Sequence, residues 1–437
     1  MRDRNLADTS GYGGIKLGCI ADDFTGATDL ANNLVRGGMR VVQTIGVPRQ
    51  ALDTQADAAV VALKSRTVSP GEAVAQSLAA LQWLKVQGAR QIYFKYCSTF
   101  DSVYNGEQRG NIGPVTEALM DALGTDFTVA TPAFPDNART VFKGHLFVGD
   151  VLLAESGMRN HPLTPMTDSN LVRVLQAQCK HPVGLLDYSV VAQGEAAIGQ
   201  RIGQLRAQGV RIAVVDALSN ADLLVLGRAL AGLPLLTAGS GLAIGLPANF
   251  SIAASPCASV LPAARGFAAV VSGSCSVATN EQVRHFISAG LSAFAIDPLQ
   301  LAAGVDVVAK ALDWAGSRLG PQPLLVYSTV DTVAVKAAQA RMGAQAAGEL
   351  VEQALARIAK GLVERGVGQL IVAGGETSGA CVQALGIERM QVGMQVAPGV
   401  PWCHALIAPH AKPLHILLKS GNFGADDIFS QAFKALS

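Results

Sequence analysis

Few residues of this sequence are charged or aromatic, and the charges nearly cancel. Charged residues fill 15% of the 437 positions and aromatic residues 5%, with 34 Lys and Arg against 33 Asp and Glu. A chain with so little net charge lacks the field of one sign that grips nucleic acid or an anionic membrane. We therefore expect no nucleic-acid partner and a small molecule as the ligand.

The sequence also lacks long apolar runs and paired cysteines. No uninterrupted apolar run reaches the roughly 18 residues that a membrane span needs, so we expect no membrane association. Residues 1–14 are polar and glycine-rich, without the apolar core of a signal peptide, and are expected to form a disordered leader. The seven cysteines are scattered and never form a C-x-x-C pair, which argues against a disulfide framework or a zinc site. These absences favour a cytoplasmic protein.

The sequence is rich in apolar residues, at 50%, and in glycine, with 46 residues. One hydrophobic core stops growing at roughly 250 to 300 residues, so we expect two domains. Continuous apolar runs alternate with amphipathic stretches, which predicts an α/β fold with a largely parallel sheet flanked by helices in each domain. A low-charge stretch rich in Ala, Ser and Pro interrupts this rhythm. We therefore predict domains at 15–246 and 266–437, a linker at 247–265, and a cleft between the domains.

Two adjacent aspartates, Asp22 and Asp23, end the first apolar run in the segment IADDFTGATD. The carboxyl end of a parallel strand faces the crevice where open α/β sheets bind ligands. Thr25 and Gly26 then open a predicted helix through Val35, whose N-terminal N–H groups suit an anion. We predict that Asp22 or Asp23 is the catalytic base and that both bind substrate hydroxyls. The alternative is that Asp23 only caps the helix.

Further polar side chains follow the next predicted strands of this domain. Arg66 lies in the segment KSRT, and Lys95, Ser98 and Asp101 lie in FKYCSTFDS. Because the ends of parallel strands converge, these side chains should share one substrate-binding cleft with the two aspartates. Cations suit the carboxylate of a polyhydroxy acid, and aspartates suit its hydroxyls. The alternative for Arg66 and for Lys95 is a solvated charge at a strand end.

Three turns with glycine follow predicted strands of the second domain: SGSCS at 272–276, GGETSG at 374–379 and KSGNFG at 419–424. Small residues let backbone amides approach phosphate oxygens, so the three turns together favour a nucleotide site. None is a Walker motif G-x-x-x-x-G-K-[ST] or a dinucleotide motif G-x-G-x-x-G, and each taken singly could be an ordinary turn. Lys419 or Lys95 could neutralise phosphate charge, and Cys275 is expected to be a small buried residue.

Taken together, the motifs resemble a known family. IADDFTGATD, LKSRT, YFKYCSTFDS, GNIGPV, SGSCS, AGGETSG, APGVPW and LKSGNFG look like the four-carbon acid sugar kinase family, and most like its 3-oxo-tetronate 4-kinase branch. The resemblance implies a sugar-acid-binding domain, a nucleotide-binding domain, and ATP and Mg²⁺ as cofactors. Its motifs imply ATP contacts at Ser272, Gly374, Gly375, Glu376, Thr377 and Gly421. The loop 102–110 departs from the family pattern by its length.

The expected activity is therefore an ATP-dependent phosphorylation of the terminal C4 hydroxyl of a sugar acid such as 3-oxo-tetronate. Closure of the cleft about the linker would exclude water from the transfer. The alternatives are an erythronate or threonate 4-kinase and a non-catalytic sugar-acid sensor. A nicotinamide-linked oxidoreductase would need the missing dinucleotide motif. The sequence leaves open which residues bind the metal and whether the chain forms a homo-oligomer.

Overall fold

The computed structural model describes residues 14–52, 55–101, 110–160, 164–328, 344–407 and 412–436. The predicted leader, apart from Gly14, and the loop 102–109 therefore lie outside the described residues. No helix of the described chain is long and apolar enough to cross a membrane. The seven cysteines are all free, as expected.

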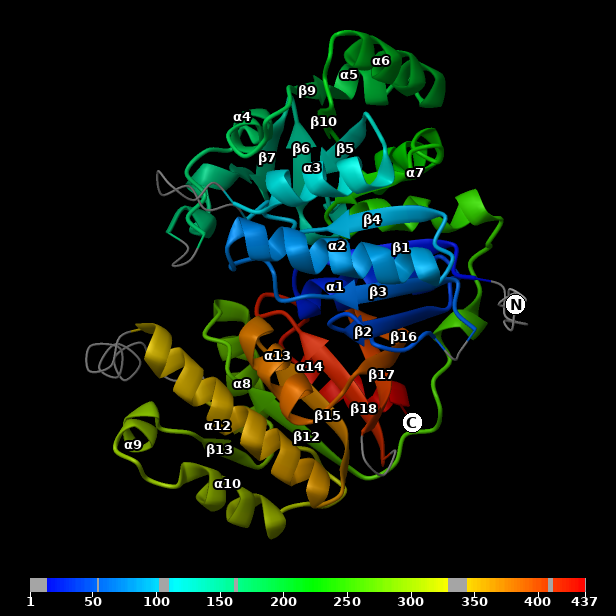
Figure 1. Ribbon diagram of the computed structural model, residues 1–437. Coiled ribbons are helices and arrows are strands. Elements are labelled where there is room, and N and C mark those ends of the chain that lie inside the picture. The colour runs from blue at the N-terminus through cyan, green and yellow to red at the C-terminus, as the bar shows by residue number, and fades with distance from the viewer. Residues whose placement is uncertain are drawn as a thin grey trace, which may run out of the picture.

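Most strands of the described chain join one sheet of fifteen strands, in the order β13-β14-β12-β15-β18-β17-β16-β2-β3-β1-β4-β11-β5-β10-β9 (Figure 1). Its strands are β1 Leu17–Ala21, β2 Val41–Ile45, β3 Ala58–Ala62, β4 Gln91–Lys95, β5 Thr128–Thr131, β9 Val183–Leu186, β10 Ile212–Val215, β11 Leu235–Ala238, β12 Phe267–Ser272, β13 Ala293–Ala295, β14 Leu324–Tyr327, β15 Val367–Ala373, β16 Arg389–Ala397, β17 Val400–Ile407 and β18 Lys412–Lys419. A small separate sheet holds β6 Arg139–Phe142, β7 His145–Val148 and β8 Val151–Leu152.

Helices connect the strands and cover the large sheet. They are α1 Phe24–Arg36, α2 Pro70–Val86, α3 Ile112–Leu123, α4 Leu171–Gln176, α5 Tyr188–Val191, α6 Glu195–Ala207, α7 Asn220–Ala229, α8 Val277–Ser288, α9 Pro298–Ala302, α10 Val307–Gly316, α12 Ala344–Glu364, α13 Gly375–Ala384 and α14 Ile428–Gln431. Strands β2, β3, β1, β4, β11, β5, β10 and β9 pair in parallel, as do β13, β14, β12, β15 and β18. The predicted α/β fold with largely parallel strands is confirmed.

The two parallel sets meet at an antiparallel seam that the sequence did not reveal. Strand β16 pairs antiparallel with β2, from Arg389 opposite Thr44 to Gln391 opposite Val42. It also forms an antiparallel hairpin with β17, which in turn pairs antiparallel with β18. Figure 1 shows the first half, blue to green, above the second half, green to red, with β2 and β16 side by side between them. The halves are thus hydrogen-bonded into one continuous sheet.

Sheet twist determines where the strand ends of the two halves lie. Because β2 and β16 are antiparallel, a flat sheet would put the carboxyl ends of β1 and β18 at opposite edges. Adjacent strands are rotated by about 20–25°, so the five steps from β18 to β1 add up to roughly 100–125°. A rotation of this size accounts for the cavity that residues after the carboxyl ends of both sets line together.

The predicted linker, 247–265, contains two short 3₁₀ helices, Pro247–Phe250 and Pro256–Ser259. Its start packs on the first half, where Asn249 donates to the carbonyl of Gly227 at 2.8 Å, and its end packs on the second, where the carbonyl of Pro262 contacts Nε2 of His415 at 2.9 Å. Helix α1 belongs to the first half yet also contacts β16, β17, β18 and α13 of the second. Any closing motion about the linker would therefore also involve the β2–β16 seam and α1.

Candidate active site

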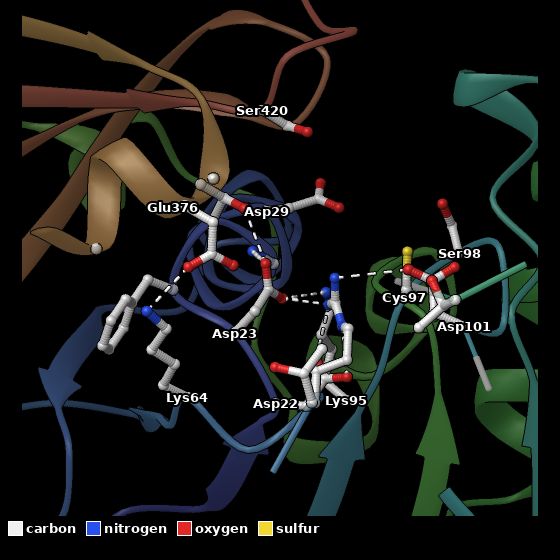
Figure 2. A pocket seen from close by; sticks show the side chains of 18 of the residues that line it. Asp22, Asp23, Asp29, Lys64, Lys95, Cys97, Ser98, Asp101, Glu376 and Ser420 are labelled. Carbon is white, nitrogen blue, oxygen red and sulfur yellow. Dashed lines mark hydrogen bonds and ion pairs between the residues drawn. The ribbon is translucent and has the colours of Figure 1, made fainter. Parts of the chain in front are cut away.

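A polar cavity of about 300 Å³ lies where the two halves meet, and we name it the aspartate cavity. Four aspartates line it together with three cations: Asp22, Asp23, Asp29, Asp101, Lys64, Arg66 and Lys95. Gly375, Glu376, Gly379, Ser420 and Phe423 line it from the second half. Figure 2 shows Asp22, Asp23 and Lys95 grouped together, with Lys64 and Glu376 on one side and Cys97 and Asp101 on the other. All six predicted substrate-binding residues, including Ser98, lie in this wall.

Arg66 holds the two adjacent aspartates together. Its Nε and Nη2 donate to both carboxylate oxygens of Asp22, at 2.9 and 2.8 Å, and Nη2 also donates to Asp23 at 2.6 Å. Its Nη1 lies 3.8 Å from a carboxylate oxygen of Asp101. The loop that carries Arg66 is fixed by Asn111, whose side-chain amide donates to the carbonyls of residues 65, 66 and 68. Arg66 is therefore a scaffold of the aspartates and not a solvated charge.

Asp23 both caps α1 and lines the cavity, so its capping role leaves room for the predicted role in substrate binding, which stays a prediction. Its Oδ2 accepts from the N–H of Gly26 at 3.2 Å and from the hydroxyl of Thr25 at 2.9 Å. Burial alone would raise the pKa of Asp23, but the charges of Arg66 and Lys95 hold that pKa well below its usual value. Asp23 is therefore a charged hydrogen-bond acceptor at neutral pH and a weak base.

Lys95 crosses the first turn of α1 and explains the glycine in DDFTG. Its Nζ lies 3.4 Å from Oδ1 of Asp23, and the residue is only 3% exposed. A Cβ atom on Gly26 would lie 1.8 Å from that Nζ. The buried lysine and the cap of α1 thus fit together only because residue 26 has no side chain.

Asp29 also lines the aspartate cavity, and the sequence reasoning missed it. It lies one turn after Thr25 on α1, is 6% exposed, and accepts from the hydroxyl of Ser240. Its other oxygen has no hydrogen-bond partner among the described atoms. Burial raises the pKa of Asp29 to about 6, although Lys95 and Ser240 act in the opposite direction. The signal was its spacing of four from Thr25, which places both residues on one helix face.

A second cavity, of about 310 Å³, adjoins the first, and we name it the glycine cavity. Its wall contains residues of all three predicted turns, namely Gly273, Ser274, Cys275, Gly374, Gly375, Glu376, Thr377 and Gly421. The turns converge because β12, β15 and β18 are parallel neighbours, with Ala373 in register with both Ser272 and Lys419. No side chain caps the N-terminus of α13, so its N–H groups suit a phosphate. Ser272 itself is fully buried and does not line the cavity.

Lys419 links its own turn, 419–424, to helix α8. Its Nζ donates to the carbonyls of Ser420 and Gly421, both at 3.0 Å, and to the hydroxyl of Thr279 at 3.1 Å. The residue is 0% exposed and lines neither cavity, and burial lowers its pKa to about 7. This geometry supports a positioning role for Lys419, and the neutralisation of phosphate charge by Lys419 or Lys95 stays a prediction. Cys275, expected to be buried, is instead exposed.

Gly375 and Glu376 line both cavities and so form their common wall. Oε2 of Glu376 pairs with Nζ of Lys64 at 2.9 Å. Glu352 of α12 lines the glycine cavity too, and burial together with the charge of Glu376 raises its pKa. No three His, Cys, Asp or Glu side chains of the described chain gather into a ready metal site. Two crowded carboxylates do fit a nucleotide-bound Mg²⁺, which takes one or two protein carboxylates.

A cavity lined by charged side chains and a cavity lined by glycine turns, with one wall in common, are typical of an α/β enzyme that brings two small substrates together. Family models agree: "Sugar-binding N-terminal domain" matches residues 17–246 and "Nucleotide-binding C-terminal domain" matches residues 269–429. The chain belongs to the four-carbon acid sugar kinase family.

Curated relatives and solved structures cover nearly the whole chain. A Burkholderia multivorans protein named 3-oxo-tetronate kinase is 58% identical over 96% of this chain and 97% of its own. An Actinobacillus succinogenes protein of the same name is 48% identical over 95% and 98%. A solved Haemophilus influenzae protein is 46% identical, with a TM-score of 0.78 over 96% of this chain and 100% of its own. A solved Salmonella typhimurium protein with a provisional tRNA-synthase name is 44% identical, with a TM-score of 0.85 over 97% and 100%.

Proposed function

We propose that this chain transfers the γ-phosphate of ATP to the terminal C4 hydroxyl of 3-oxo-tetronate, giving the 4-phosphate and ADP. The observation that carries the proposal is the common wall of the two cavities at Gly375 and Glu376. Phosphoryl transfer needs the donor and acceptor oxygens nearly in line, and two adjoining cavities can hold two substrates in that way. The relatives named 3-oxo-tetronate kinase support this choice of acceptor.

Residues 15–246 would hold the sugar acid and residues 266–437 the nucleotide, with 247–265 as the link. In the aspartate cavity, Asp23 would accept a hydrogen bond from the acceptor hydroxyl and orient it. A loose transition state asks little of a base, so the low pKa of Asp23 is no obstacle. Asp22, bound on both oxygens by Arg66, would act mainly by holding that scaffold in place.

In the glycine cavity, the backbone at Gly374, Gly375, Thr377 and Gly421 would approach the phosphates. Ser272 would act only by fixing the start of its turn, because it is fully buried. Glu352, which lines the glycine cavity, is the carboxylate that would hold Mg²⁺, and Mg²⁺ would supply charge neutralisation to the phosphates when bound. Lys95, buried against Asp23, would place a fixed positive charge beside the acceptor.

A coupled ADP-release assay tests the reaction with the 3-oxo-tetronates, erythronate and threonate as acceptors. We expect the highest kcat/KM with a 3-oxo-tetronate. A preference for erythronate or threonate would show that 3-oxo-tetronate is not the main acceptor. No ADP release with any of these acceptors would contradict the proposed kinase activity. A thermal shift with sugar acid but none with ATP analogues would indicate the sensor instead.

The role of Asp23 is tested by Asp23→Asn, with Asp22→Asn as its neighbour variant. Asp23→Asn should lower kcat by about 100-fold or more while the Kd for an ATP analogue changes little. Near-normal turnover in Asp23→Asn would contradict the assignment. Asp22→Asn should act mainly on the free energy of unfolding, measured in urea.

A further inference from the structure

Lys64 reaches from the first half of the chain to the second across the common wall of the cavities. It follows β3 and lines the aspartate cavity, while its partner Glu376 lies in the first turn of α13. Their Nζ and Oε2 atoms are 2.9 Å apart, and each side chain is 56% exposed. Figure 2 shows this ion pair at one side of the aspartate cavity, with Asp23 beyond it.

The other two cations of the aspartate cavity are fixed, whereas Lys64 is able to move. Arg66 donates to both oxygens of Asp22 and to Asp23, and Lys95 is 3% exposed beneath Asp23. Lys64 carries its charge on a flexible four-carbon stem in a half-exposed position. An exposed ion pair contributes little to stability, so exchanging its partner costs little.

The pair lies where a transferred phosphate has to pass. A phosphate that moves from the glycine cavity to the aspartate cavity must pass the wall made by Gly375 and Glu376. Glu376 and Glu352 place negative charge there, and the hydrogen bond and charge of Glu376 raise the pKa of Lys64. A third phosphate arriving at this wall therefore needs a cation, and Lys64 already lies there.

We propose that Lys64 leaves Glu376 and binds the γ-phosphate, so that the sugar-acid half of the chain detects a nucleotide with three phosphates. This inference rests on the proposed kinase function. ADP ends short of the wall and leaves the Lys64–Glu376 pair intact. Lys64 is thus a phosphate ligand that distinguishes ATP from ADP, and it follows the phosphate to the aspartate cavity.

The test is the binding of ADP and of the β,γ-imido analogue of ATP, measured by titration calorimetry. Lys64→Met should raise the Kd for the analogue about tenfold and the Kd for ADP less than twofold, because only the analogue presents a γ-phosphate. Lys64→Arg keeps the charge and should restore most of the preference. Lys143→Met is the matched control, since Lys143 is similarly exposed, at 54%, and pairs with Asp187 at 3.7 Å away from both cavities.

Equal weakening of both nucleotides by Lys64→Met, or no weakening of either, would overturn the role of Lys64. If the wild-type protein bound neither nucleotide, this result would contradict the proposed kinase function and, with it, this inference. The two failures are distinguishable because the wild-type titration is read first. The pair is exposed, so the Lys64→Met protein should remain folded.

Discussion

The aspartate cavity and the glycine cavity have nearly the same size but are built in different ways. The first is lined by charged side chains that are fixed by ion pairs, as Arg66 fixes Asp22 and Asp23. The second is lined by turns in which glycines leave room for neighbouring hydroxyls, as Gly273 does for Thr377 and Gly421 for Ser274. The difference suits the two ligands that we propose for these cavities. A sugar acid is recognised by its pattern of hydroxyls, whereas phosphates are held by backbone N–H groups.

The largest effect should come from Arg66→Met in the aspartate cavity. The change leaves the buried carboxylates of Asp22 and Asp101, each 8% exposed, without their cation. Breaking a buried ion pair costs about 3–5 kcal/mol of the free energy of unfolding, which urea denaturation would measure. Arg206→Met, which breaks an exposed pair with Asp126, should cost at most about 1 kcal/mol. Equal losses in the two variants would show that Arg66 is no scaffold.

The next effect concerns Asp29 and depends on pH. Its pKa is about 6 in the folded chain against a usual 3.8, so the folded state binds more protons between these values. The free energy of unfolding should therefore fall as the pH rises through this window, by up to about 3 kcal/mol. Asp29→Asn should raise the free energy of unfolding at pH 7.5 and change it little at pH 4. Urea denaturation at both pH values would measure this.

Asp57→Asn is a control for that experiment, because we expect it to change the free energy of unfolding in the opposite direction. Arg40 and Lys16 lower the pKa of Asp57 to about 2, against the effect of burial. This group contributes stability above its unfolded pKa that is lost as the pH falls towards 2. Asp57→Asn should therefore destabilise the protein at pH 7.5. No gain of stability in Asp29→Asn at pH 7.5 would contradict the burial effect at Asp29, and a gain in Asp57→Asn would contradict its stabilisation by Arg40 and Lys16.

Gly26→Ala should change the kinetic constants for the sugar acid but not those for ATP. The new Cβ would lie 1.8 Å from Nζ of Lys95 and 2.1 Å from Oδ1 of Asp23, so both charges must move. We expect kcat/KM for the sugar acid to fall about 100-fold, as misplacement by about 1 Å can do, with the KM for ATP nearly unchanged. Gly71→Ala is the control, because nothing lies within 4 Å of its new atom.

The smallest effect should come from Gly421→Ala in the glycine cavity. Its Cβ would lie 2.6 Å from Oγ of Ser274, and this hydroxyl can turn aside. The KM for ATP should rise about tenfold, with the KM for the sugar acid unchanged. Steady-state kinetics with each substrate varied would show it. If Gly421→Ala raised the KM for the sugar acid instead, the proposed division of roles between the two cavities would be wrong.

Much of the candidate site could be predicted from local sequence. Polar residues after apolar runs predicted that Asp22, Arg66 and Lys95 lie together, because the ends of parallel strands share one edge. The family resemblance was confirmed by the comparisons. The assignment of single residues to sugar acid or ATP stays a prediction. Asp29 was missed because a carboxylate inside a helix gives no strand-end signal, and the full burial of Lys419 was not predicted because depth is invisible in the sequence.

The sequence by itself thus determined the two parallel strand sets and the side chains at their carboxyl ends, because strand periodicity and turn residues are local properties. Only the tertiary structure decided how the sets combine. Pairing of β2 with β16 depends on residues about 345 positions apart, such as Thr44 and Arg389, which no local pattern links. That antiparallel seam and the accumulated twist bring Glu376 against Lys64 and give the two cavities their common wall.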